Sequence, residues 1–182
     1  MTKKYKYKDE LIKAMEYLGK KSDTIFLGQS VKYSGNAIFN TLIKVPNKKK
    51  IETPVFEDVQ MGMSTGMAMN GLVPITCFPR YDFLICAMNQ IINHLDKMRL
   101  MSRNEFRPKV IIRTSIGSKK PLDGGPQHTQ DYTEMFKNTL TEIKVIYLKD
   151  PKKIFSSFKK AYEDKSSYSY LFVEHGDFYN DK

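Results

Sequence analysis

The chain has 182 residues, of which 41% are hydrophobic and 27% are charged, and its formal net charge is +10 at pH 7. This length and composition predict a single globular domain, residues 1–182, with a full hydrophobic core. No apolar run approaches the length of a membrane span, and the basic N-terminus lacks the apolar core of a secretory signal. Cys77 and Cys86 have no CxxC spacing and fit a reducing compartment, so we expect a cytoplasmic protein that contacts no membrane.

The basic charge suggests nucleic-acid binding, which depends on clustered Lys and Arg. Only five of the 30 basic residues are Arg, and the Lys are spread along the chain with short runs at 48–50, 152–153 and 159–160. Such runs are typical of loops and solvent-facing surfaces, and no aromatic side chains alternate with them. We therefore expect no nucleic-acid partner. A basic binding module stays open as an alternative that steeply salt-dependent binding would reveal.

Helix and strand patterns alternate along the first half of the chain. Leu11, Met15 and Leu18 fall at helical spacing, and Gly71 is placed as a helix C-cap. Gly35, Pro46 and the lysine run favour an irregular connection. The expected elements are a helix over 7–20, a strand over 24–30, an irregular connection over 31–54, a helix over 56–71 and a strand over 72–78.

The second half continues the alternation. The clearest helical pattern begins at Asp82, which we expect to cap it, and Asp150 with Pro151 marks another helix start. The expected elements are a helix over 82–101, a strand over 108–115, a Gly- and Pro-rich loop, a short helix over 130–137, a strand over 143–148, a helix over 150–165 and a strand over 168–175. This order predicts a three-layer α/β/α sandwich around a mostly parallel sheet.

Several chemistries find no support in the motifs. His94, His128 and His175 are far apart, and no HxxxH or CxxC spacing is present, so we expect no metal ligands on this chain. A nucleophile elbow, a Walker loop and a GxGxxG fingerprint are also absent. Gly62 and Gly66 lie on one helical face and favour close approach of another backbone, because glycine otherwise costs about 1 kcal/mol in a helix.

Four residues remain as candidates, each with two interpretations. Glu57 starts a helix made mostly of Met, Gly and Ala, and it is either a carboxylate favoured by the helix dipole or a functional acid. Tyr81 and Phe83, in the stretch CFPRYDF, either pack in the core or form a binding surface. His128, in DGGPQHTQ, is either a surface histidine or an active-site residue. Taken singly, the residues leave both interpretations open.

Seven short motifs follow one another in the order found in a known family. They are Tyr33 to Gly35, Thr53-Pro54 with Glu57, Gly62 and Gly66, Asn70 to Ile75, Phe78 to Phe83, Asn89 to Asn93, and Gly124 to Gln130. Together they resemble the pyrimidine-binding (transketolase central-region) domain of thiamin-diphosphate-dependent enzymes. The likeness is strongest to the β subunits of pyruvate and branched-chain 2-oxo-acid dehydrogenase first components, and it spans about residues 5–175.

The resemblance implies a thiamin-diphosphate-binding fold and a role for each candidate. In the family, the glutamate at the position of Glu57 hydrogen-bonds N1′ of the cofactor's aminopyrimidine and helps the thiazolium ring lose its C2 proton. The stacking aromatic falls on Phe83, with Tyr81 as the nearest substitute. His128 matches a histidine that handles the substrate carboxylate or a proton. Arg80, where relatives usually have a small or acidic residue, either reaches an anionic substrate or is an exposed loop arginine.

Two departures from the family pattern concern partners. The family's β subunits continue into a C-terminal domain, and no stretch here resembles the diphosphate-binding half that holds magnesium. The resemblance therefore implies a diphosphate-binding partner subunit, in a heterodimer or a dimer of heterodimers. Mg²⁺ would be held mainly by that partner chain. The implied enzyme decarboxylates or oxidises a small 2-oxo acid, or transfers a two-carbon unit. The alternative is a non-catalytic scaffold or regulatory subunit, although a scaffold has no use for a buried unpaired carboxylate.

Overall fold

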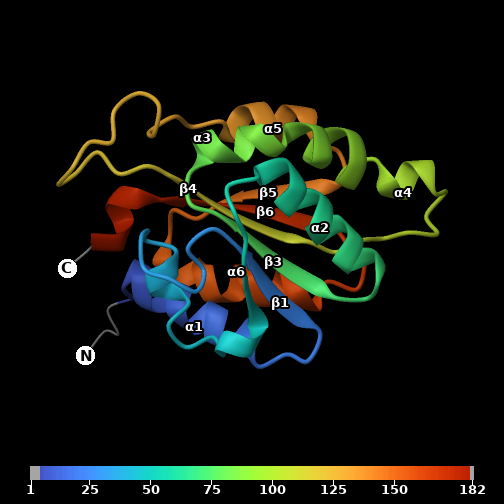
Figure 1. Cartoon of the computed structure of the whole chain (residues 1–182), viewed down its shortest axis with the longest axis horizontal. Helices are drawn as coiled ribbons and strands as arrows, with labels where there is room; N and C mark the ends of the chain where they lie inside the picture. Colours follow the sequence, from blue (N-terminus) through green and yellow to red (C-terminus); the bar gives the residue numbers. More distant parts are fainter. Residues whose placement is uncertain (1–4, 181–182) are drawn as a thin grey trace.

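The structure, a computed structural model, describes residues 5–180. One sheet of six strands forms its centre, and every neighbouring pair of these strands runs parallel (Figure 1). Their order across the sheet is β2-β1-β3-β4-β6-β5. The strands are β1 (Thr24–Gly28), β2 (Lys50–Glu52), β3 (Val73–Phe78), β4 (Ile111–Ile116), β5 (Ile143–Tyr147) and β6 (Ser169–His175). The predicted α/β fold with a mostly parallel sheet is confirmed.

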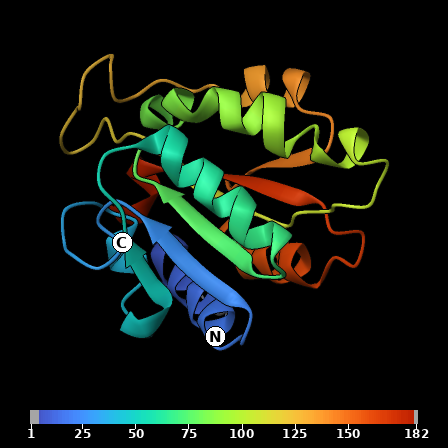
Figure 2. The same ribbon diagram turned by 45° about the vertical axis from the view of Figure 1, so that its right-hand side comes forward.

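Helices cover both faces of the sheet, as the predicted sandwich requires (Figures 1 and 2). On one face α1 (Tyr7–Gly19) packs beside α6 (Pro151–Glu163). The other face carries α2 (Glu57–Met69), α3 (Tyr81–Leu84) with the segments that continue it, and α5 (Thr133–Thr139). Short 3₁₀ turns lie at η1 (Phe39–Thr41), η2 (Asn47–Lys49) and η5 (Gly176–Asn180). None of the helices in residues 5–180 is long and apolar enough to cross a membrane.

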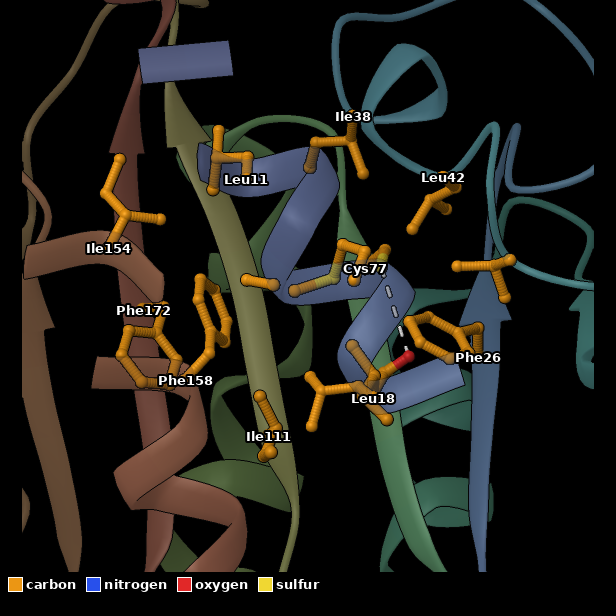
Figure 3. Close-up of a cluster of buried hydrophobic side chains, with 14 of the residues drawn as sticks. Leu11, Leu18, Phe26, Ile38, Leu42, Cys77, Ile111, Ile154, Phe158 and Phe172 are labelled. Carbon is orange, nitrogen blue, oxygen red and sulfur yellow. Dashed lines mark hydrogen bonds between the residues drawn. The ribbon is translucent and has the colours of Figure 1, made fainter. Parts of the chain in front are cut away.

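Each face of the sheet has its own hydrophobic core. Figure 3 shows part of the core under α1 and α6, where Leu11, Leu18, Phe26, Phe158 and Phe172 meet. The opposite core gathers Met61, Phe78, Tyr81, Ile91 and Phe136. Full burial of a large apolar side chain is worth roughly 1.5–3 kcal/mol relative to exposure. These two cores fix the helices against the sheet, and the carboxyl ends of the strands form a rigid edge.

The segment 31–54 is more ordered than the sequence predicted. Lys50–Glu52 forms β2, which pairs in parallel with β1 through Phe26, Leu27 and Gly28. The expectation of an irregular connection over this whole segment was therefore wrong. Three residues that begin at the end of a lysine run show no strand pattern, and only pairing with the edge of β1 makes them a strand.

The helix expected over 82–101 is present only in pieces. It consists of α3, a 3₁₀ turn η3 (Ile85–Ala87), a π-helical turn η4 (Gln90–Leu95) and α4 (Met98–Met101). Asp82 is not its cap, because Arg80 occupies that position and the Asp82 carboxylate instead accepts a hydrogen bond from Gln130 Nε2 at 2.8 Å. By contrast, Asp150 caps α6 as predicted, accepting from the Lys152 N–H at 3.0 Å.

The sheet order places a topological switch point between β1 and β3. From β1 the chain first adds β2 on one side and then returns to add β3 on the other. The connection after β1 therefore runs to one side, and the connection after β3, which leads to β4, runs to the other, which opens a crevice beyond the carboxyl ends of these two strands. Ligands of open parallel α/β sheets bind at such points.

Candidate functional site

A cleft of about 370 Å³ lies at the carboxyl edge of the sheet. Its walls come from the segments that follow four strands, namely β1, β3, β4 and β6. The lining includes Gln29, Arg80, Phe83, Ser118 and Tyr179. In Figure 1 the long gold loop between β4 and α5 extends beside the red C-terminal turn at this edge. Residues far apart in the sequence thus meet at one place.

Glu57 is the first residue of α2 and stands beside this cleft. Its carboxylate is half-buried, and Gln29 Nε2, from the cleft wall, lies 3.5 Å from Glu57 Oε1. The partial positive charge of the helix N-terminus favours a carboxylate here. No cation of residues 5–180 lies within ion-pair distance of this carboxylate. Glu57 is therefore a half-buried acceptor with hydrogen-bonding capacity left over among the described residues.

The structure brings Phe83 and His128 into contact. Their rings meet edge to face, with centroids 5.7 Å apart and planes at 88°. His128 Nδ1 lies 3.1 Å from the Gly124 carbonyl oxygen. An N–H at Nδ1 can donate to that carbonyl, which leaves Nε2 as the acceptor. Phe83 lines the cleft and presents an aromatic surface there, whereas His128 contacts Phe83 without being among the lining residues.

Tyr81 lies elsewhere. Its side chain is fully buried, stacks on Phe136 at a centroid distance of 5.7 Å and meets Tyr132 edge to face. Burial raises the pKa of the Tyr81 phenol well above its usual value. These contacts favour a packing role, and the prediction that Tyr81 contacts a cofactor gains no support from them.

Close backbone contacts hold the cleft walls together. A Cβ on Gly28 would lie 2.3 Å from the Cys77 carbonyl oxygen, so only glycine lets β1 end this close to β3. A Cβ on Gly117 would lie 1.7 Å from the His128 carbonyl oxygen and 2.8 Å from Arg80 Nη1. Gly117 therefore brings the arginine after β3 and the histidine loop to the same point.

Two carboxylates anchor the loops around the cleft. Glu52 accepts hydrogen bonds from the N–H groups of Val31 and Lys32 at 2.9 and 2.8 Å, which fixes the turn after Gln29. Asp177 accepts from Ser118 Oγ and from two loop N–H groups at 2.7–2.9 Å. Burial alone would raise the pKa of Asp177, but these hydrogen bonds outweigh it and lower that pKa.

A buried ion pair lies next to the cleft residue Tyr179. The Arg113 guanidinium donates to both carboxylate oxygens of Glu174 at 2.6 and 2.9 Å, and both side chains are fully buried. Tyr179, which lines the cleft, donates its hydroxyl to the same carboxylate. Burial, followed by the charge of Glu174, raises the pKa of Tyr179 well above its usual value. Burial likewise raises the pKa of the nearby Cys77 thiol to about 11, so it stays protonated.

No group of three or more His, Cys, Asp or Glu side chains within residues 5–180 is arranged to hold a metal ion. The site thus consists of a shielded carboxylate, an aromatic–histidine pair and one arginine. This set can accept a hydrogen bond, stack a flat ring and move a proton.

The sequence itself matches a family model. The model is described as the transketolase pyrimidine binding domain, and the match covers residues 3–179. The chain belongs to this family. The family resemblance inferred from the motifs is therefore confirmed, and its fold expectation agrees with the parallel sheet described above.

Relatives of this pyrimidine-binding chain include β subunits of 2-oxo-acid dehydrogenases. It is 29% identical over 162 residues to the pyruvate dehydrogenase E1 component subunit beta of Gracilaria tenuistipitata var. liui, covering 87% of this chain and 49% of the relative. It is 28% identical to the 2-oxoisovalerate dehydrogenase subunit beta of Bacillus subtilis, covering 93% of this chain and 51% of the relative. The chain thus spans about half the length of these relatives.

A solved structure shares the fold. The structure titled "Split gene transketolase, inactive beta4 tetramer" superposes with a TM-score of 0.71 over 93% of this chain and 51% of that chain. The sequence identity is 17%, so this likeness concerns the fold alone.

Sequence reasoning missed several residues that shape the site of this pyrimidine-binding domain. Arg113 and Glu174 interrupt otherwise apolar strands, and two opposite charges in buried strands are a signal for a buried pair. No sequence pattern marks Glu52 or Asp177, because each carboxylate accepts hydrogen bonds from backbone N–H groups of a loop that is distant in the sequence. Gly117 was hidden in a Gly-rich segment whose contacts depend on the fold.

Proposed function

We propose that this chain supplies the pyrimidine-binding half of a thiamin-diphosphate site. The enzyme decarboxylates or oxidises a 2-oxo acid, or transfers a two-carbon unit from a ketose-like donor. One observation carries the proposal. Glu57, a half-buried carboxylate that no cation of residues 5–180 pairs with, stands at the switch point of a parallel sheet beside the cleft that Phe83 lines.

The residues present fit the aminopyrimidine of this cofactor. Among residues 5–180 the Glu57 carboxylate has one hydrogen-bond partner, the Gln29 amide at 3.5 Å, so it can accept a further hydrogen bond from a ring N–H. Phe83 offers an aromatic ring for stacking. When bound, thiamin diphosphate supplies the carbon that attacks the substrate carbonyl and then holds the resulting negative charge.

In this assignment the chain's own side chains position groups and move protons. Glu57 keeps its hydrogen-bonded partner in the tautomer that can accept a proton, and the low-dielectric surroundings strengthen that hydrogen bond. His128 is held by Gly124 through Nδ1, and its Nε2 takes or returns a proton on the substrate side. Phe83 orients the His128 ring and shields one wall from water.

Binding of the diphosphate is assigned to a partner subunit, in a heterodimer or a dimer of heterodimers. The same partner mainly holds the Mg²⁺ ion. The surface around Glu57 supports this assignment. Val55, Phe56 and Val59 are each more than half exposed, and a Cβ on Gly66 would meet nothing within 4 Å. A chain that covered these apolar residues at the start of α2 would also seal Glu57 from water. Residues 1–182 then act as one pyrimidine-binding domain.

Purification of the tagged chain from its own host tests this function. We expect a partner subunit in stoichiometric amount, together with thiamin diphosphate and magnesium measured by mass spectrometry and metal analysis. Recovery of the chain without a partner and without cofactor, under conditions that keep assemblies intact, would contradict the proposal. That result would favour the scaffold alternative.

A further inference from the structure

Arg80 differs from the other arginines of the chain. Arg99 and Arg113 are shielded and form ion pairs with Glu142 and Glu174, whereas Arg103 and Arg107 are exposed. Arg80 is half-buried, and no carboxylate of residues 5–180 lies within 4.0 Å of its guanidinium. A partly buried cation without a counter-charge attracts an anion more strongly than a fully solvated one does.

The position of Arg80 directs this charge into the cleft. Arg80 follows β3 and is the only charged residue among the 14 described residues that line the cleft. The other lining side chains are neutral, and several carry amides or hydroxyls, including Gln29, Asn36 and Asn180. Asp177, next to the lining residue Gly176, is already occupied by Ser118 and the N–H groups of the loop. Arg80 is therefore the one charge on the described lining of the cleft, and no carboxylate of residues 5–180 pairs with it.

Gly117 places that charge beside the proposed reacting groups. Arg80 Nη1 would lie 2.8 Å from a Cβ on Gly117, and the same Cβ would touch the His128 carbonyl oxygen. Phe83 is three residues after Arg80, one turn further along α3, and contacts the His128 ring. An anion on the guanidinium would thus lie close to Phe83 and His128.

We propose that Arg80 binds an oxyanion of the substrate, a carboxylate or a phosphoryl group, and so selects anionic substrates. The planar guanidinium can donate two parallel hydrogen bonds to either group. Assignment of the anion to the substrate rests on the proposed function, but the anion site itself depends only on this chain. Arg80 is a specificity-determining residue in this account.

Titration of the ¹⁵N-labelled full chain with pyruvate and, separately, with inorganic phosphate tests the site at constant ionic strength. We expect saturable shifts of the backbone N–H signals of Phe83, Gly117 and Ser118. Arg80→Gln weakens binding about tenfold or more. Arg80→Lys weakens binding less, because lysine keeps the positive charge but cannot donate two parallel hydrogen bonds as the planar guanidinium does. Lys119→Gln, an exposed charge in the adjacent loop, leaves binding unchanged.

The two probes distinguish the sources of the anion. Binding of pyruvate identifies a carboxylate site, and binding of phosphate alone identifies a phosphoryl site. The proposal is overturned if neither anion gives saturable shifts. It is also overturned if Arg80→Gln binds the anion as tightly as the wild type and the control variant Lys119→Gln do. An unchanged spectrum away from the cleft shows that Arg80→Gln is folded, and Arg80→Lys provides the second variant. This binding needs neither partner nor cofactor, so its failure is separate from failure of the proposed function.

Discussion

Two arginines, one within β4 and one just after the neighbouring strand β3, have opposite surroundings. Arg113, within β4, is fully buried and holds Glu174 through two hydrogen bonds of 2.6 and 2.9 Å. Arg80, just after β3, is half-buried and unpaired among the described residues, as is Glu57 at the start of α2. Paired charges inside the sheet hold the architecture, whereas unpaired charges at its carboxyl edge remain available to a ligand. The difference separates residues that stabilise the fold from residues that act on something else.

Loss of the paired arginine gives the largest expected change in stability. Arg113→Met leaves Glu174 buried without its cation, so the free energy of unfolding should fall by about 3–5 kcal/mol. Arg80→Met removes a charge that has no partner, and the expected change is below about 1 kcal/mol. Urea unfolding of the two variants checks this contrast. Equal losses would show that Arg80 also holds the fold.

Asp96 is a second paired charge, and its effect depends on pH. This buried carboxylate accepts from Lys97 Nζ at 2.7 Å and from the N–H groups of Thr141 and Glu142 at 3.0 and 2.8 Å. Burial alone would raise the pKa of Asp96, but the hydrogen bonds outweigh it and lower that pKa. The stabilisation is therefore present above the unfolded-state pKa of about 3.9 and is lost as pH falls toward the lower folded-state value.

Asp96→Asn tests this dependence. Between pH 6 and pH 3 the wild type should lose up to about 1 kcal/mol more of its unfolding free energy than the variant, because the variant has no carboxylate to protonate and pH 3 lies only about one unit below the unfolded-state pKa. Urea unfolding over a pH series measures the difference. Parallel curves for the two proteins would contradict the assignment of acid sensitivity to Asp96.

Two glycines give expected effects in opposite directions. Gly66→Ala, in α2 with no atom within 4 Å of the added Cβ, should stabilise the isolated chain by up to about 1 kcal/mol. Gly117→Ala pushes against the His128 backbone and should destabilise it by about 1–2 kcal/mol. Thermal unfolding of both variants measures the changes. A stabilising Gly117→Ala would show that the cleft wall is not tightly packed there.

Much of the fold could be predicted because its patterns are local. The apolar runs of β1, β3 and β6, the spacing in α1 and the Asp150–Pro151 start of α6 all appear in short windows of sequence. The elements that were predicted wrongly depend on tertiary contacts. The short β2 exists only because β1 offers a free edge, and the predicted 82–101 helix is interrupted by a π-helical turn directly before Asp96, which binds the start of β5.

The site could be predicted only in part. Motif order singled out Glu57, Phe83 and His128, and the structure brings Phe83 and His128 into contact and sets Glu57 beside the cleft that Phe83 lines, while the roles of these residues stay predictions. The sequence could not show that Tyr81 faces the core while Phe83, two residues later, lines the cleft, because the helix direction decides this. Nor could it show which arginine lacks a partner, since pairing depends on residues up to 61 positions away.

Turnover by the assembled complex carrying Glu57→Gln tests the central claim most directly. Asp58→Asn is the matched control, because Asp58 is an exposed carboxylate in the same first turn of α2. We expect Glu57→Gln to lower kcat about 100-fold or more while assembly and thermal stability are retained, and Asp58→Asn to change it little. Activity of Glu57→Gln within a few-fold of the wild type would contradict the account and leave Glu57 as a carboxylate that only stabilises its helix.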